Sequence, residues 1–144
     1  MITVSETIST ALPAGAAFDY LSAFEHTSEW DPGTPVVEKR SPGPVAVGTK
    51  YYAEAEFNGK RQPIDYVVTE LGASSITLRG ENKRVISVDT ITVTPGPAGS
   101  SVNYTAKFTL KGIARLVEPF VKSRFQELAE PAVQGMKAKL DSLA

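Results

Sequence analysis

The sequence predicts an α+β fold in which a curved antiparallel sheet of about seven strands wraps around one long C-terminal helix. Between residues 112 and 143, apolar residues recur at intervals of three or four, which is the spacing of one helix face. Most of the chain before this stretch alternates between polar and apolar residues, the pattern of strands with one buried face. A long amphipathic helix must bury its apolar stripe, and these strands offer the surface for it.

The first part of the chain predicts one strand followed by two short helices. Residues 2–10 alternate and predict the strand. Pro13 ends this strand and suits the first turn of a helix over 13–23. A second short helix is expected over 24–30, because the sequence AspProGly that follows would stop it.

The middle of the chain predicts a meander of six further strands. The dipeptide Asn58-Gly59 lies between two alternating runs and is a strong hairpin signal, because a type I′ turn needs positive φ at both of its central positions. Sequences rich in proline and glycine predict loops at 41–44 and 95–100. The expected strands cover 36–40, 48–57, 60–71, 75–81, 84–94 and 101–110.

The predicted C-terminal helix contains two prolines. Pro119 and Pro131 each remove a backbone hydrogen bond, so we expect a kink or a break at each. We expect Leu116, Phe120 and Leu128 on the inner face of this helix, opposite the apolar rows of the strands. A bent helix over a curved sheet tends to leave a space between the two.

Composition limits the classes of function. With 144 residues and no linker sequence, the chain is expected to form one domain over 1–144. The formal net charge of −1 and the absence of a basic stripe argue against a nucleic-acid partner. The absence of cysteine excludes disulfides and thiolate chemistry. Neither a signal peptide nor a membrane span is recognisable, so we expect a cytoplasmic monomer or homodimer.

The sequence contains no recognisable metal or cofactor motif. His26 is the only histidine, and no loop has the ligand spacing of a calcium or magnesium site. A Ser-His-Asp triad would have to use His26, and no nucleophile-elbow sequence is present. A glycine-rich dinucleotide motif is also absent. We therefore expect neither a metal nor a cofactor.

Asp89 is the most informative polar residue of the predicted strands. Its alternation partners are apolar, so its carboxylate is expected to point inward, where it must find a partner or be protonated. Arg79 and Arg84 on neighbouring strands are the candidate partners. Either Asp89 belongs to a structural salt bridge or faces water, or it acts as a general acid or base in a pocket. Inward tyrosines either fill the core or orient a polar atom of a ligand.

Strand alternation and helix spacing together select the candidate site residues. Asp89 and Tyr104 are the candidates for proton transfer. The expected ligand contacts are Tyr51, Ala53, Tyr66, Asp89, Ile91, Tyr104, Phe108, Leu116 and Phe120.

Several short motifs give the sequence a resemblance to a known superfamily. They are AFDYL at 17–21, EWDPG at 29–33, SPGPVAVGT at 41–49, YVVTEL at 66–71, VDTITV at 88–93 and VNYTAKFTLKG at 102–112. With these motifs, nearly the whole chain resembles the START-like superfamily, whose helix-grip fold is shared by polyketide cyclase/dehydrase-like and lipid-transport proteins. The resemblance implies a deep apolar cavity between the long helix and the concave face of the sheet. The sequence Trp30-Asp31-Pro32 is part of the resemblance, which implies that Trp30 lies at the open end of the sheet, either at the cavity entrance or as a plug.

Three functions remain open at this point. The first is a protein that holds an apolar, aromatic or lipid-like small molecule in its interior. The second is an enzyme of the aromatase/cyclase or dehydratase type, which orients a polyketide in a dry pocket while Asp89 or a tyrosine moves protons. The third is an interaction module with a filled interior. A cavity lined by Asp89 and a tyrosine favours the enzyme, an apolar cavity favours the carrier, and a collapsed interior favours the module.

Overall fold

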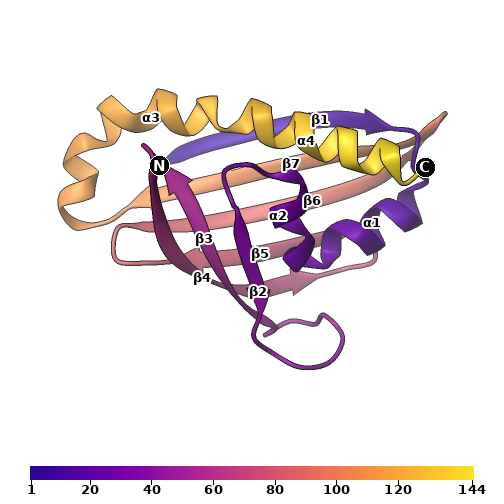
Figure 1. The fold of residues 1–144 in the computed structure, drawn as a ribbon, viewed down its shortest axis with the longest axis horizontal. Helices are drawn as coiled ribbons and strands as arrows, with labels where there is room; N and C mark the ends of the chain where they lie inside the picture. Colours follow the sequence, from indigo (N-terminus) through magenta and orange to yellow (C-terminus); the bar gives the residue numbers. More distant parts are fainter.

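A curved seven-stranded antiparallel sheet forms the frame of the protein in a computed structural model that describes residues 1–144 (Figure 1). The strand order is β1-β7-β6-β5-β4-β3-β2, so the predicted meander is confirmed and the first strand pairs with the last. The strands are β1 (Ile2–Thr10), β2 (Val36–Lys39), β3 (Lys50–Phe57), β4 (Lys60–Leu71), β5 (Ser75–Glu81), β6 (Val85–Gly96) and β7 (Gly99–Leu110).

The β3–β4 hairpin forms where the sequence predicts it. Asn58 and Gly59 have φ angles of 53° and 76°, and pairing resumes at once between Phe57 and Lys60. Positive φ at both central positions is the conformation of a type I′ turn, whose twist matches that of the flanking strands. This short turn fixes the register of β3 against β4 and therefore which side chains face the interior.

The prediction of a loop over 95–100 is wrong because it is too long. Strands β6 and β7 continue into it, with Gly96 paired to Gly99, so only two residues remain in the turn. Contacts with the end of β1 hold these strand ends in place. A Cβ on Gly99 would overlap the backbone of Thr10, and Ser100 Oγ donates a 2.8 Å hydrogen bond to the carbonyl of Leu12. A proline- and glycine-rich composition could not reveal these long-range contacts.

Two short helical segments between β1 and β2 close one end of the sheet, as predicted. They are α1 (Ala14–Ser22) and a 3₁₀ turn η1 (Phe24–His26) that continues into α2 (Thr27–Trp30). Asp31 ends α2, and its carboxylate accepts 2.8 and 2.9 Å hydrogen bonds from the Gly33 N–H and the Thr34 hydroxyl. These bonds order the chain where it leaves the helix for the sheet.

The C-terminal helix is broken where its prolines lie, as predicted. It consists of a 3₁₀ segment η2 (Gly112–Val117), then α3 (Glu118–Glu127) and α4 (Ala129–Ser142). Pro119 and Pro131 both lie in the first turn of an α-helix, where a missing N–H costs nothing. None of the helices has the length and apolarity needed to cross a membrane.

The expected inner face of this helix is wrong at Leu116 and Phe120, whose exposed fractions are 75% and 79%. The prediction assumed one continuous α-helix, whereas residues 112–117 form a 3₁₀ helix. Within α3, Phe120 lies eight residues before Leu128, which leaves the two side chains roughly 80° apart around the helix, whereas Val121 and Phe125 lie within about 60° of Leu128. The side chains that face inward are therefore Ala114, Val117, Val121, Phe125 and Leu128.

Helix α4 packs firmly over β1 and α2 (Figure 1). Met136 and Leu140 are fully buried, and the backbone of α2 passes so close to Gly135 that a Cβ there would overlap the Trp30 carbonyl. At the end of β1, Asp141 accepts hydrogen bonds from the Thr10 hydroxyl at 2.6 Å and from the Ala11 N–H at 3.1 Å. Apolar packing and these bonds together fix α4 against the sheet.

Candidate functional site

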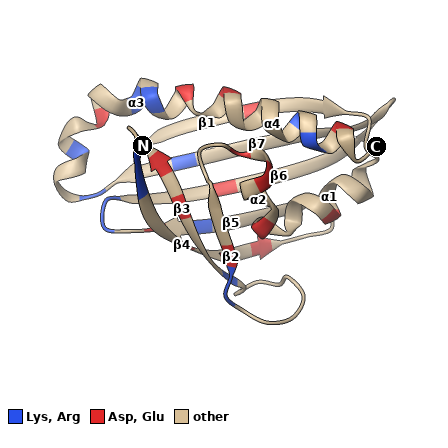
Figure 2. Ribbon diagram, in the orientation of Figure 1, with Lys and Arg blue, Asp and Glu red and all other residues tan.

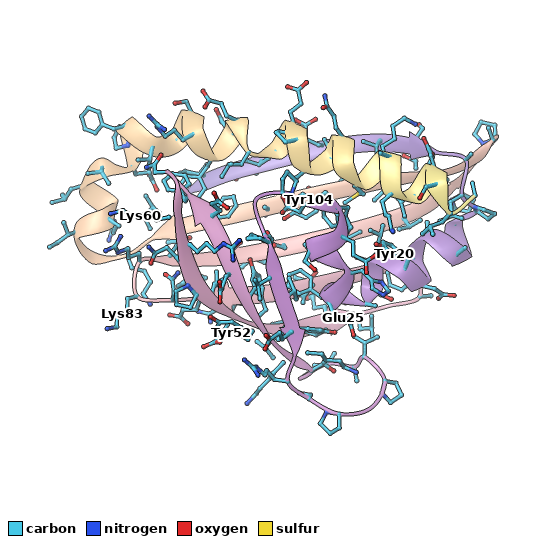
Figure 3. The ribbon with its side chains drawn as sticks, viewed as in Figure 1. Tyr20, Glu25, Tyr52, Lys60, Lys83 and Tyr104 are labelled. Atoms are coloured by element: carbon cyan, nitrogen blue, oxygen red, sulfur yellow. The ribbon has the colours of Figure 1, made fainter.

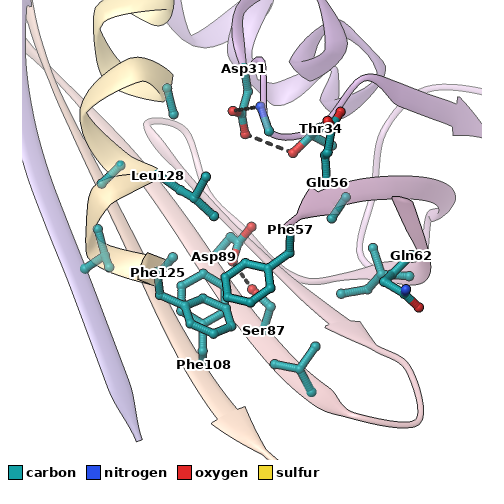
Figure 4. Close-up of a pocket in the computed structure, with 18 of the residues that line it drawn as sticks. Asp31, Thr34, Glu56, Phe57, Gln62, Ser87, Asp89, Phe108, Phe125 and Leu128 are labelled. Carbon is teal, nitrogen blue, oxygen red and sulfur yellow. Dashed lines mark hydrogen bonds between the residues drawn. The ribbon is translucent and has the colours of Figure 1, made fainter. Parts of the chain in front are cut away.

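A cavity of about 470 Å³ lies between the concave face of the sheet and the C-terminal helices (Figure 4). Its walls come from β1, β3, β4, β6, β7, the α2 region, α3 and α4. Of the 32 residues that line it, 20 are hydrophobic, so the walls are mainly apolar with a smaller set of polar groups. This volume and this composition are typical of a small-molecule site.

Three phenylalanine rings form one wall of the cavity, as Figure 4 shows. Phe125 from α3 packs against Phe57 of β3 and Phe108 of β7, with ring centroids 4.7 Å apart in both pairs. Beside them, Arg124 Nη1 donates a 2.8 Å hydrogen bond to Asn58 Oδ1 in the β3–β4 turn. Helix α3 is therefore held over the cavity by these aromatic contacts, by this exposed hydrogen bond and by an exposed 3.1 Å ion pair between the N-terminal ammonium group of Met1 and Glu118.

Basic side chains lie at the rim of the cavity, on the turns that connect the strands. Lys60 begins β4 directly after the β3–β4 turn, Arg84 lies in the β5–β6 turn, and both are exposed. Figure 2 shows Lys and Arg residues at these turns and along α3. Because these groups lie in water, salt screens their charges from the cavity interior.

Asp89 lies at the centre of a group of polar side chains on the cavity wall, here called the polar cluster: Tyr66, Ser87, Asp89 and Tyr104. The Asp89 side chain is only 5% exposed. Its Oδ1 accepts a 2.6 Å hydrogen bond from Ser87 Oγ, and its Oδ2 accepts a 3.2 Å bond from the Tyr104 hydroxyl. The ring of Tyr104 lies between the C-terminal helices and the sheet (Figure 3).

Strand pairing explains how the polar cluster assembles. The β6–β7 register places Asp89 opposite Ala106 and Ser87 opposite Phe108, so alternation directs all of them to the cavity face. Tyr66 comes from β4 and lies over Gly80 of β5, where a Cβ would be 2.5 Å from a ring carbon of Tyr66. The absence of a side chain at Gly80 therefore makes room for the Tyr66 ring.

Burial raises the pKa of Asp89 to about 6, from an ordinary value of 3.8. Hydrogen bonds from Ser87 and Tyr104 oppose this shift by stabilising the carboxylate, and the nearby charge of Asp31 adds to it. Burial, together with the charge of Asp89, also raises the pKa values of Tyr66 and Tyr104, so both phenols stay neutral. Asp89 can therefore exchange a proton near neutral pH.

The arginine partner expected for Asp89 is not there. Arg79 instead pairs with Glu81 at 2.8 Å, and Arg84 is exposed near the β5–β6 turn. By alternation on β5, Arg79 belongs to the face away from the cavity. The partners of Asp89 are neutral hydroxyl groups, which satisfy hydrogen bonds without supplying a positive charge.

Asp31 is a second carboxylate on the cavity wall. Burial raises its pKa, while the hydrogen bonds from Gly33 and Thr34 oppose the shift. The negative charge of Asp31 also contributes to the raised pKa of Asp89. The sequence pattern gave no reason to include Asp31, because a loop has no alternation to follow.

The structure brings six of the predicted site residues to the cavity wall: Trp30, Tyr66, Asp89, Ile91, Tyr104 and Phe108. Whether they contact a ligand remains a prediction. Tyr51 and Ala53 are buried in the core but do not line the cavity, and Tyr51 packs its ring against Phe24 at 5.3 Å. Leu116 and Phe120 point to solvent, for the reason of helix phase given above.

Trp30 does not form an open entrance. It is 5% exposed, and its ring packs edge-on against Tyr104 at 6.2 Å. The α4 backbone at Gly135 covers it from the other side, so Trp30 belongs to a closed wall. Sequence reasoning missed Val121 and Phe125, although their spacing to Leu128 follows a helix face once the helix is started at Glu118.

Comparison with known proteins adds a family and a set of similar folds. The family model described as "Polyketide cyclase / dehydrase and lipid transport" matches residues 1–144. Among proteins with curated functions, none matches this chain.

Several solved structures share the fold at low sequence identity. A START superfamily protein from Mycobacterium smegmatis has a TM-score of 0.82 at 16% identity, with 100% of both chains covered. The Zhui aromatase/cyclase from Streptomyces sp. R1128 has a TM-score of 0.81 at 13% identity, covering 96% of this chain and 93% of that one. The di-domain ARO/CYC StfQ from the steffimycin biosynthetic pathway has a TM-score of 0.70 at 12% identity, covering 95% of this chain and 49% of that one.

Proposed function

The chain belongs to the polyketide cyclase / dehydrase and lipid transport family, and on this premise we propose that it binds a small, mainly apolar molecule in the cavity between the sheet and the C-terminal helices. The observation that carries the proposal is the open volume of about 470 Å³ with mainly apolar walls. An interaction module with a filled interior would not contain such a space.

The distribution of polar groups supports one orientation for the bound molecule. The phenylalanine rings of β3, β7 and α3 offer an apolar surface, while the polar cluster offers hydroxyl and carboxylate groups. A few convergent polar groups in an apolar cavity fix the orientation of a ligand. The ligand then places its skeleton against the rings and a polar end against Asp89.

Binding can be tested by fluorescence titration with the uncharged probe N-phenyl-1-naphthylamine. Ala106 is buried on the cavity wall opposite Asp89, so Ala106→Phe fills the cavity with a ring. Lys107→Phe adds the same ring to the exposed face of β7 and serves as the control. We expect saturable one-to-one binding in the wild type and in Lys107→Phe, and loss in Ala106→Phe. Equal binding in all three proteins would overturn the proposal.

A second candidate function is an enzyme of the aromatase/cyclase or dehydratase type, and the contact between Asp89 and Tyr104 favours it over a plain carrier. Asp89 would take a proton from a carbon next to a carbonyl and return it to a departing hydroxyl group, which leaves as water. Tyr104, held neutral, would donate a hydrogen bond to the oxygen on which charge develops.

Turnover and binding separate the two candidates. For the enzyme, Asp89→Asn should abolish dehydration of a β-hydroxy ketone while N-phenyl-1-naphthylamine still binds. For the carrier, the wild-type protein should return the same β-hydroxy ketone unchanged after long incubation. Mass spectrometry of the recovered small molecule measures both outcomes.

A further inference from the structure

The inner wall of the cavity carries two carboxylates and no positive charge to balance them. Asp31 and Asp89 both line the cavity, and neither forms a salt bridge. All their hydrogen-bond donors are neutral: the hydroxyls of Thr34, Ser87 and Tyr104 and the backbone N–H of Gly33. The protein therefore satisfies the hydrogen bonding of these groups in part and leaves their charge uncompensated.

Both carboxylates retain capacity to bind a further donor. An ionised carboxylate accepts about four hydrogen bonds, and Asp89 accepts one on each oxygen. A buried carboxylate without a counter-ion is costly, and a positive group beside it removes much of that cost. Asp89 is buried on a wall that faces open space, so a ligand can reach it.

The basic residues of the cavity do not serve as these counter-ions. Lys60 and Arg84 are exposed on the strand turns at the rim, where water screens them. Glu56 of β3 also lines the cavity and is exposed, so the hydrated rim carries charges of both signs while the inner wall at Asp31 and Asp89 is acidic. Only a group carried by the ligand can bring a cation to the inner wall.

We propose that the ligand is an apolar amine whose ammonium group binds beside Asp89 and Asp31. This inference rests on the proposed binding function and specifies the chemistry of the polar end. An ammonium group brings donors and the missing charge, a hydroxyl group brings a donor alone, and a carboxylate adds a third negative charge. The cavity therefore ranks ligands of one skeleton in the order amine, alcohol, acid.

Three compounds with the same ring system test this order at about pH 7.5. They are 2-(naphthalen-1-yl)ethylamine, 2-(naphthalen-1-yl)ethanol and naphthalene-1-acetic acid, each used to displace N-phenyl-1-naphthylamine. We expect the amine to bind at least about tenfold more tightly than the alcohol, which corresponds to about 1.4 kcal/mol, and the acid to bind most weakly. An amine that binds no better than the alcohol, or an acid that binds best, overturns the inference but leaves the binding function standing. Failure of the probe itself to bind removes both.

Two variants locate the preference. Asp89→Asn keeps the shape and most hydrogen bonds of the side chain but removes its charge, so the amine should lose its advantage over the alcohol. Asp19→Asn removes an exposed carboxylate of α1 and should leave the advantage unchanged. A preference that survives Asp89→Asn unaltered overturns the assignment to this carboxylate.

The pH dependence of binding to the wild-type protein also tests whether the charge of Asp89 produces the preference for the amine. The titratable groups that face Asp89 are Asp31 after α2, Tyr66 of β4 and Tyr104 of β7, and both phenols stay neutral in the relevant range. Lowering the pH from about 7.5 to about 5 protonates Asp89, whose pKa is about 6. The ratio of amine to alcohol affinity should fall severalfold across this range, and a ratio independent of pH contradicts the proposal.

Discussion

The two halves of the C-terminal segment differ in how they meet the rest of the molecule. In α4, five side chains are buried, and Asp141 and Gly135 join the helix closely to β1 and α2. In η2 and α3, no residue is fully buried, and Leu116 and Phe120 are exposed. The sequence pattern is nevertheless amphipathic through both halves.

This difference follows from what lies beneath each half. Helix α4 rests on β1 and on the core, so its apolar stripe is in contact with protein. Helix α3 contacts β1 along one side and spans the cavity, where Phe125 reaches Phe57 and Phe108. Apolar periodicity therefore indicates that a helix has a covered face, but it does not show whether protein or open space lies under that face.

The largest expected effect is in α4. Met136 is fully buried, so Met136→Ala should lower the free energy of unfolding by about 2–5 kcal/mol, the usual cost of removing a large core side chain. Urea denaturation measures it. A loss below about 1 kcal/mol would mean that α4 is no better packed than α3.

Asp89→Asn tests whether Asp89 is shielded from water on the cavity wall, as its raised pKa indicates. The folded-state pKa of about 6 exceeds the ordinary 3.8, so ionisation of Asp89 costs stability, and this loss develops as the pH rises from about 4 through 6. The variant should therefore be more stable than the wild type at pH 7, by up to about 3 kcal/mol. The difference should nearly vanish below about pH 4. Urea denaturation of both proteins across this pH range measures the difference in their free energies of unfolding. A difference that does not change with pH would show that Asp89 is hydrated.

Phe125→Ala tests how much the aromatic contacts of α3 across the cavity contribute to stability. Its ring contacts Phe57 and Phe108 but borders open space, so we expect a loss of about 1–2 kcal/mol, less than the 3–5 kcal/mol typical of a close-packed phenylalanine. The affinity for N-phenyl-1-naphthylamine should change at the same time. A full-sized stability loss with unchanged probe affinity would indicate a packed core in place of the cavity.

Phe120→Ala is the smallest expected effect. The ring is 79% exposed, so the change in unfolding free energy should stay within about 0.5 kcal/mol. From the sequence alone, Phe120 would have been expected to line the interior and to cost several kcal/mol. Thermal or urea denaturation distinguishes these outcomes, and a loss above about 2 kcal/mol would restore the inward placement.

The sheet was predictable because its signals are local. Alternation with period two assigns each side chain to a face, and the Asn58-Gly59 turn fixes the register of β3 against β4. Tyr66, Asp89 and Tyr104 lie on the cavity wall, and their contact with a ligand stays a prediction. The same alternation could not find the partners of Asp89. Ser87 on its own strand and Tyr104 across the ladder are its donors, and the expected arginine belongs to the other face.

The helical part of the site was less predictable because it depends on phase and on contacts distant in sequence. The 3₁₀ segment before Glu118 changes the phase of Leu116 relative to α3, and apolar spacing alone does not reveal such a segment. Trp30 is held at the cavity wall where α4 passes closely over its backbone at Gly135. That approach becomes visible only when the chain is folded.

The most direct test of the cavity and its polar end is a titration of isotope-labelled protein with N-phenyl-1-naphthylamine, followed through backbone amide chemical shifts. We predict that the largest changes fall on residues 87–91 of β6 and 104–108 of β7, around Asp89 and Tyr104, and that the exposed residues Ile113, Leu116 and Phe120 change little. Changes confined to Ile113, Leu116 and Phe120, with β6 and β7 undisturbed, would contradict an interior binding site.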